Sequence, residues 1–153
     1  MNDTARLHET TKSKMMDIGI DFDGTCVTHE YPLIGRPVGA EPVLMELVKK
    51  GHNLILFTMR SDRRIKNIWG TSEELYLSDA VKWFEDRGIP LYGIQENPTQ
   101  KEWTDSPKAY AQVYIDDAAI GCPLVFPENT EADERPYVDW NRVREMLIAT
   151  GLL

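Results

Sequence analysis

Two aspartates stand two residues apart near the start of the chain, directly after an apolar stretch. The segment from Asp17 to Thr25 reads Asp-Ile-Gly-Ile-Asp-Phe-Asp-Gly-Thr. Its alternating apolar residues predict a short strand, and Gly24 predicts a tight turn at its end. Side chains two positions apart on a strand point to the same side, so we expect the carboxylates of Asp21 and Asp23 to lie together. Such a pair binds a hard cation or performs carboxylate chemistry, although an isolated pair of this kind is more often an ordinary surface turn.

Helices and strands largely alternate along the rest of the chain. Thr71 and Glu74 form a capping box that predicts the start of a helix, and Asp139 predicts the cap of the last helix. The basic segment 60–70 is interpreted as a loop or an irregular helical piece, and residues 1–14 as a flexible lead-in. We expect helices over 41–50, from 71 to 88 and from 139 to 151, and further strands over 53–58, 91–94, 111–117 and 123–126. This pattern predicts an α/β fold: a three-layer, Rossmann-like parallel sheet flanked by helices, in one domain over residues 15–153.

Polar residues end three of the predicted strands. They are Asp21 with Asp23, Thr58, and Asp116 with Asp117. Ligands of open parallel sheets bind beyond the carboxyl ends of the strands, so we expect these residues to share one rim. A core threonine and a pair of turn aspartates are the plain alternatives, but an unpartnered carboxylate pair at the end of a buried strand is costly and favours a ligand there.

Composition limits the classes of function. The chain has 153 residues, 42% of them hydrophobic, and a net charge of −8. The negative charge argues against binding nucleic acid or anionic membranes over the whole surface, and no apolar run approaches the roughly 20 residues that span a bilayer. Cys26 and Cys122 are too few for a disulfide scaffold and lack metal-site spacing, so we expect a reducing, cytoplasmic location.

Taken in order, these motifs resemble the haloacid dehalogenase (HAD) superfamily of phosphohydrolases. The resemblance rests on residues 21–25 after an apolar strand, Thr58 at the end of 54–57, a lysine shortly before the fourth strand, and Asp116 with Asp117 at the end of that strand. It covers about residues 17–126. It implies a HAD-like sheet with the first strand central, and hydrolysis of a phosphomonoester through an aspartyl-phosphate.

The resemblance also implies roles for the acidic residues. Asp21 would be the nucleophile, and Asp23 would exchange a proton with the leaving oxygen and later with water, an effect of roughly 10²- to 10⁴-fold. An anionic site that receives an anionic substrate needs a compensating cation, and oxygen ligands favour Mg²⁺. The implied ligands are the Asp21 side chain, the Asp23 backbone carbonyl and Asp116, with Asp117 as a further or water-mediated contact.

The remaining implied residues bind the phosphoryl group. Thr58 would hold an oxygen, and Lys108 would offset charge in the transition state, with Lys101 as the alternative lysine. The implied substrate-binding residues are Gly24, Thr25, Thr58, Met59, Arg60 and Lys108.

The substrate is less constrained than the chemistry. Segments 26–39 and 95–107 are too short to hold a cap domain, so we expect an open site unless a homo-oligomer partner covers it. The basic cluster Arg60, Arg63, Arg64 and Lys66 either contacts a second anionic group of the substrate or is a solvated helix face. His29, in the segment 26–39, either approaches a leaving group or is an ordinary polar loop residue, and the second interpretation is preferred.

The sequence is compatible with more than one substrate class and more than one function. The preferred substrate is a small phosphorylated metabolite, and a nucleic-acid end is the alternative within the phosphatases. A receiver-like phosphoacceptor module also combines carboxylates, Thr, Lys and Mg²⁺, but there the acidic pair belongs to the first strand, which is the reverse of the order found here. A fold member that only binds ligands is the third alternative.

Overall fold

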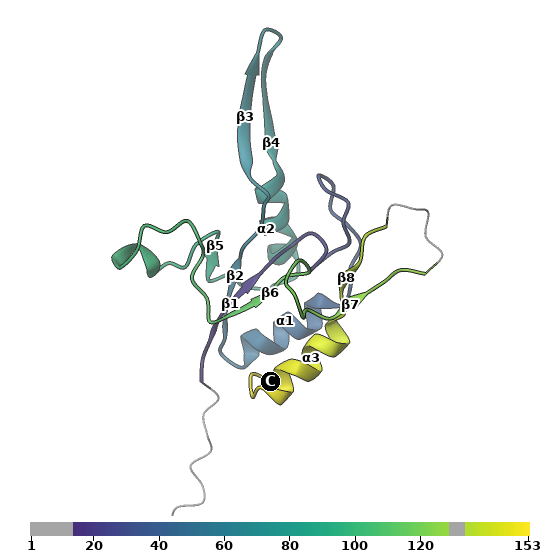
Figure 1. Cartoon of the computed structure of the whole chain (residues 1–153). Helices are drawn as coiled ribbons and strands as arrows, with labels where there is room; N and C mark the ends of the chain where they lie inside the picture. The colour runs from purple at the N-terminus through teal and green to yellow at the C-terminus, as the bar shows by residue number, and fades with distance from the viewer. Residues whose placement is uncertain (1–13, 129–133) are drawn as a thin grey trace, which may run out of the picture.

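A four-stranded parallel sheet forms the centre of the protein (Figure 1). The computed structural model describes residues 14–128 and 134–153. The strands lie in the order β5 (Gly93–Ile94), β2 (Asn53–Leu56), β1 (Asp17–Ile20) and β6 (Val113–Ile115). Neighbouring strands are parallel, so their carboxyl ends meet at one edge. The predicted α/β, Rossmann-like architecture is confirmed, with the first strand in an interior position.

In the described part of the chain, three α-helices accompany the sheet. They are α1 (Ala40–Lys49), α2 (Tyr76–Asp86) and α3 (Trp140–Ala149). The cap predicted for the last helix is present, because the Asp139 side chain accepts a hydrogen bond from the backbone N–H of Arg142 at 3.2 Å. The first and last helices agree with the sequence prediction to within two residues at each end.

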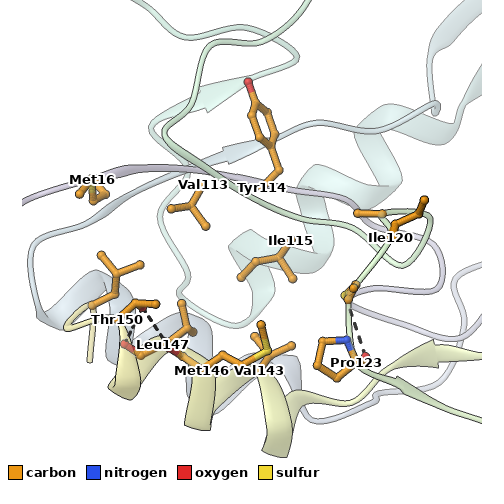
Figure 2. A pocket seen from close by; sticks show the side chains of 14 residues that line it. Met16, Val113, Tyr114, Ile115, Ile120, Pro123, Val143, Met146, Leu147 and Thr150 are labelled. Atoms are coloured by element: carbon orange, nitrogen blue, oxygen red, sulfur yellow. Dashed lines mark hydrogen bonds between the residues drawn. The ribbon is translucent and has the colours of Figure 1, made fainter.

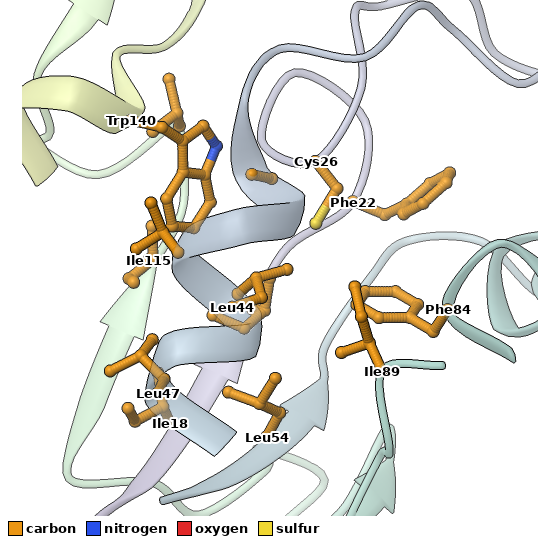
Figure 3. Close-up of a cluster of buried hydrophobic side chains, with 14 of the residues drawn as sticks. Ile18, Phe22, Cys26, Leu44, Leu47, Leu54, Phe84, Ile89, Ile115 and Trp140 are labelled. Carbon is orange, nitrogen blue, oxygen red and sulfur yellow. The ribbon is translucent and has the colours of Figure 1, made fainter. Parts of the chain in front are cut away.

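The apolar core lies on the sheet face that carries Ile18 and Ile20. All three helices contribute side chains to it, among them Leu44, Leu47, Phe84 and Trp140 (Figure 3). Phe22, which separates Asp21 from Asp23, is fully buried in this core and packs against Trp83 and Phe84 with ring centroids 5.8 and 6.2 Å apart. Burying such a ring contributes about 1.5–3 kcal/mol. The turn that carries both aspartates is therefore anchored through the residue between them.

The opposite face of the sheet is covered by the connection from β5 to β6, which contains the short 3-10 helix η1 (Gln100–Glu102). Asn97 fastens this connection by donating from Nδ2 to a carboxylate oxygen of Asp17 at 2.8 Å and to the carbonyl of Tyr110 at 3.2 Å. A Cβ on Gly19 would lie 2.7 Å from the Tyr114 ring. Glycine in β1 therefore makes room for an aromatic ring of the neighbouring strand.

A β-hairpin projects from the body between β2 and α2 (Figure 1). Its strands are β3 (Asp62–Asn67) and β4 (Gly70–Leu75), paired antiparallel in a separate two-stranded sheet. The predictions of a loop or helical piece over 60–70 and of a helix starting at Thr71 are both wrong. Arg63 and Arg64 stand directly opposite Glu74 and Glu73, and such opposite-charge cross-strand pairs stabilise a hairpin.

The predicted capping box fails because Glu74 serves the hairpin instead. Helix α2 begins only at Tyr76 and has no side-chain cap at Leu75. A residue outside the helix provides an acceptor for its first turn: the Asp62 carboxylate in β3 accepts a hydrogen bond from the backbone N–H of Ser78 at 2.9 Å. A cap contributed by a residue sixteen positions earlier has no local sequence signature.

The last predicted strand, over 123–126, is present as β7 (Leu124–Val125). It pairs antiparallel with β8 (Tyr137–Val138) in a small sheet of its own and does not join the parallel sheet. The predicted lead-in over 1–14 falls outside the described residues except for Lys14. Within the described ranges, no helix is long and apolar enough to cross a membrane.

Candidate active site

The parallel register brings three aspartates together at the carboxyl edge of the sheet. Ile20 of β1 is paired with Ile115 of β6, so Asp21 and Asp116 follow the two strands at the same level. The backbone N–H of Asp21 extends the ladder by donating to the carbonyl of Ile115 at 3.1 Å. One carboxylate oxygen each of Asp21, Asp116 and Asp117 lies within 4.8 Å of the others.

The cluster is electrostatically unfavourable as it stands. Burial raises the pKa of Asp21 from 3.8 to about 8, with Asp116 and Asp117 adding to the rise. The backbone N–H of Phe22 and the Thr25 hydroxyl oppose the shift without cancelling it. A divalent cation among these oxygens would remove the repulsion, so the donor set fits a hard metal ion.

Thr25 connects the acidic residues. Its fully buried hydroxyl lies 3.0 Å from Oδ2 of Asp21 and 3.3 Å from Oδ1 of Asp117, and it accepts a hydrogen bond from the backbone N–H of Asp117 at 3.2 Å. The Thr25 carbonyl accepts from Nε1 of Trp140 at 2.7 Å, which ties this turn to α3. Thr25, predicted as a substrate-binding residue, is thus positioned to hold two carboxylates in place.

His29 is the neighbour of the cluster that sequence reasoning missed. Its Nε2 lies 2.8 Å from Oδ2 of Asp117. The ring lies directly over Gly24, where a Cβ would come within 1.9 Å of Nε2. Gly24 has a φ of +79°, so both its backbone conformation and its contact with His29 favour glycine. Both carboxylate oxygens of Asp117 therefore have protein partners, which fits a contact to a metal through water better than direct ligation.

Asp23 is not a member of the cluster of three aspartates; its side chain pairs with Arg60. The guanidinium donates from Nε to Oδ2 at 2.8 Å and from Nη2 to Oδ1 at 2.7 Å. The Arg60 side chain is fully buried, and that of Asp23 is 16% exposed. This bidentate ion pair was not foreseen, because Arg60 was predicted to face the substrate or solvent.

Thr58 and Met59 follow β2, the other neighbour of β1. The Thr58 hydroxyl accepts a hydrogen bond from the backbone N–H of Arg60 at 3.1 Å, and its own N–H donates to Oε1 of Gln95 at 2.9 Å. Thr58 is 9% exposed, whereas the Met59 side chain is almost fully exposed. The structure thus brings Thr58 to the predicted edge of the sheet.

The two candidate lysines are on the surface. The Lys108 ammonium lies over the ring of Tyr114, 5.2 Å from its centroid, and Tyr114 stands two residues before Asp116 in the sequence. Lys101 pairs with Glu96 at 3.3 Å. Within the described part of the chain, neither lysine forms an ion pair with the aspartates, so their assignment stays a prediction.

The predicted basic cluster is divided by the fold. Arg60 is buried beside Asp23, while Arg63 and Arg64 lie on the hairpin and pair with Glu74 at 2.6 Å and Glu73 at 2.9 Å. The four residues do not form one basic surface at the sheet edge.

An apolar pocket of about 550 Å³ lies between β6 and α3, beside the strand that leads to Asp116 (Figure 2). Val113, Ile115, Met146 and Leu147 line it, and none of the three clustered aspartates does. A doubly charged phosphate would lose its hydration there without gaining polar partners. The pocket is therefore unsuited to a phosphorylated group, and the carboxylate rim is the candidate active site.

Comparison with known proteins supports the fold and leaves the family open. No family model matches the chain, and a search of curated proteins finds no match. Among solved structures, the chain is similar to one described as a conserved protein coded by a locus from Bacteroides thetaiotaomicron. The two share 28% sequence identity and a TM-score of 0.66, over 90% of this chain and 93% of that one. That description assigns no activity.

Proposed function

We propose that the protein is a hydrolase of the HAD superfamily that removes phosphate from a phosphomonoester with the help of Mg²⁺. The observation that carries this proposal is the convergence of Asp21, Asp116 and Asp117 within 4.8 Å at the ends of two adjacent parallel strands. Carboxylate oxygens from two strands suit a hard divalent cation. Asp21 and Asp116 would hold the ion directly, with Asp117 contributing through water.

In the proposed reaction, Asp21 is the nucleophile. Its carboxylate oxygen attacks phosphorus, the bond from phosphorus to the ester oxygen breaks, and the alcohol leaves with a proton. Water then attacks phosphorus of the aspartyl-phosphate, which releases inorganic phosphate and restores the carboxylate. A bound Mg²⁺ would supply charge neutralisation for the phosphoryl oxygens.

Asp23 is proposed to move the protons in both steps. It must deliver a proton to the leaving oxygen in the first step and accept one from water in the second. In this structure both of its oxygens accept hydrogen bonds from the Arg60 guanidinium. Thr58 and Lys108 are proposed to hold the phosphoryl oxygens, with Gly24 and Met59 at the entrance.

A small phosphorylated metabolite is the proposed substrate class. The hairpin arginines each have a glutamate partner, so they do not offer a free basic surface to a polynucleotide. The nucleic-acid alternative predicts phosphate release from oligonucleotide ends that weakens steeply with salt, whereas a small substrate shows little such dependence.

The test is a panel of phosphomonoesters assayed with and without Mg²⁺, beside Asp21→Asn and the surface control Asp86→Asn. We expect metal-dependent phosphate release that Asp21→Asn abolishes and Asp86→Asn leaves within two-fold. Borohydride reduction during turnover should convert Asp21 to homoserine, detectable by peptide mass spectrometry. Full activity of Asp21→Asn would reject the covalent route. Labelling of Asp21 by acetyl phosphate without any phosphomonoester turnover would favour the phosphoacceptor module instead.

A further inference from the structure

Arg60 is unusual among the charged residues of this protein because its side chain is fully buried. We propose that Arg60 is a positioning residue: it fixes the Asp23 carboxylate and the loop over residues 26–39 in one arrangement beside Asp21. That Arg60 holds Asp23 and the loop in place is argued from its contacts alone. The effect of this positioning on catalysis rests on the proposed phosphatase function.

Every N–H group of the Arg60 guanidinium has an acceptor. A guanidinium carries five such donors in a fixed planar fork. Two of them bind the two oxygens of Asp23, as described above. The other three reach backbone carbonyls: Nη1 donates to Pro32 at 3.1 Å and to Tyr76 at 3.3 Å, and Nη2 donates to Leu33 at 2.7 Å. The side chain therefore joins the aspartate turn, the loop and the start of α2, and it has no N–H left for a substrate.

Aromatic rings complete the enclosure of the guanidinium. Its central carbon lies 5.1 Å from the centroid of the Phe22 ring and 5.3 Å from that of the Tyr31 ring. Such contacts contribute roughly 0.5–2 kcal/mol, with the larger values at desolvated sites. One ring belongs to the aspartate turn and the other to the loop, so both segments lose a contact if the guanidinium moves.

Gln95 holds the backbone from which Arg60 extends. Its Nε2 donates to the carbonyls of Thr58 at 2.6 Å and Arg60 at 3.0 Å, and its Oε1 accepts from the N–H of Thr58. Gln95 has a φ of +64°, an uncommon conformation for a residue other than glycine. Such strain persists where surrounding contacts impose it, and here it aims the amide group at the strand end that carries Arg60.

A lysine cannot reproduce this arrangement. It has three donors on one atom and no planar fork, so it can satisfy neither both oxygens of Asp23 in parallel nor all three carbonyls. In Arg60→Lys we therefore expect Asp23 to rotate and the loop to loosen while Asp21 and its neighbours stay in place.

The catalytic test compares two leaving groups. A nitrophenolate leaves phosphorus readily, whereas an alkoxide requires a proton from a well-placed group. We expect Arg60→Lys to lower kcat on an alkyl phosphate by about 100-fold and on 4-nitrophenyl phosphate by less than about ten-fold, with KM changed little. Arg63→Lys, an exposed arginine on the hairpin, is the matched control and should behave as wild type. Equal losses on both substrates would mean that Arg60 only supports the fold.

A second variant and a second measurement guard against misfolding and against failure of the proposed function. Gln95→Asn keeps a residue type that tolerates positive φ but is too short to reach Thr58 and Arg60, so it should show the same leaving-group pattern more weakly. Amide hydrogen exchange at Thr28 and Arg36, whose N–H groups are hydrogen-bonded within this loop, should be at least ten-fold faster in Arg60→Lys and Gln95→Asn than in Arg63→Lys. This measurement does not need phosphatase activity. Unchanged exchange at Thr28 and Arg36 in both variants would overturn the proposal, whereas faster exchange in a protein without turnover would leave the positioning role standing and reject only the function.

Discussion

His29 and Asp117, eighty-eight residues apart in the sequence, face each other with Nε2 of the imidazole 2.8 Å from Oδ2 of the carboxylate. The Thr25 hydroxyl lies 3.3 Å from Oδ1, the other oxygen of the same carboxylate. Asp117 is therefore oriented from two sides, in the way that outer residues commonly orient the ligands of a metal site.

We predict that His29→Ala weakens divalent metal binding by about 10- to 100-fold, because the Asp117 carboxylate loses one of its two supports. Titration calorimetry with Mg²⁺ and Mn²⁺ measures the effect. Glu30→Gln, at the exposed neighbouring position, is the control. Equal metal affinity in His29→Ala and the wild type would show that the imidazole contact is incidental.

Asp21→Asn is predicted to change how stability depends on pH in the metal-free protein. The pKa of Asp21 is raised from 3.8 to about 8 in the folded state, so the folded protein holds this proton more tightly than the unfolded chain. Its contribution to stability is fully present below about pH 4 and is lost as the pH rises to about 8. The thermal midpoint of Asp21→Asn should therefore rise relative to wild type between pH 4 and 8 and change no further above that range. Saturating Mg²⁺ should reduce the difference, and midpoints that run parallel across the range would contradict the assigned repulsion.

Gly24→Ala should cost more stability than the same change at Gly121. Both glycines have positive φ, but a Cβ at Gly24 would meet His29 at 1.9 Å, whereas at Gly121 no atom lies within 4 Å. The backbone penalty alone is about 1 kcal/mol. Urea unfolding should show a loss near that value for Gly121→Ala and a clearly larger one for Gly24→Ala, together with weakened metal binding. Similar losses at the two positions would argue against a fixed His29 ring.

The two candidate lysines give opposite expectations. Lys108 lies over the Tyr114 ring close to the strand that ends in Asp116, whereas Lys101 is engaged with Glu96. We predict that Lys108→Gln lowers kcat by at least about ten-fold and that Lys101→Gln stays within two-fold, as measured in the phosphomonoester assay. The reverse ranking would transfer the role to Lys101.

The parts of the site that follow from local sequence were predictable. Alternating apolar residues place Asp21 at a strand end, and a short apolar run places Asp116 at another. The rule that parallel strands share a carboxyl edge then brings them together, and the register of Ile20 with Ile115 bears this out.

The missed parts depend on contacts between distant residues. Arg60 and Asp23 are 37 positions apart, and a basic residue in a polar segment gives no sign of a buried partner. Gln95 acts through a side chain that reaches back to β2, which no periodicity encodes. The hairpin was misread because Glu74 satisfies a helix-capping pattern and a cross-strand charge pair equally well, and only the pairing with Arg63 decides between them.

Two hydrogen bonds connect the C-terminal part of the chain to the turn after Asp23. The Trp140 indole donates to the carbonyl of Thr25, and the N–H of Val138 donates to the carbonyl of Gly24. The stretch that resembles the superfamily stops well before either donor. A shortened version cut back to that stretch would keep all four aspartates of the candidate site but lose the two hydrogen bonds that support the turn after Asp21. An inactive truncation would therefore say nothing about the chemistry of the intact protein.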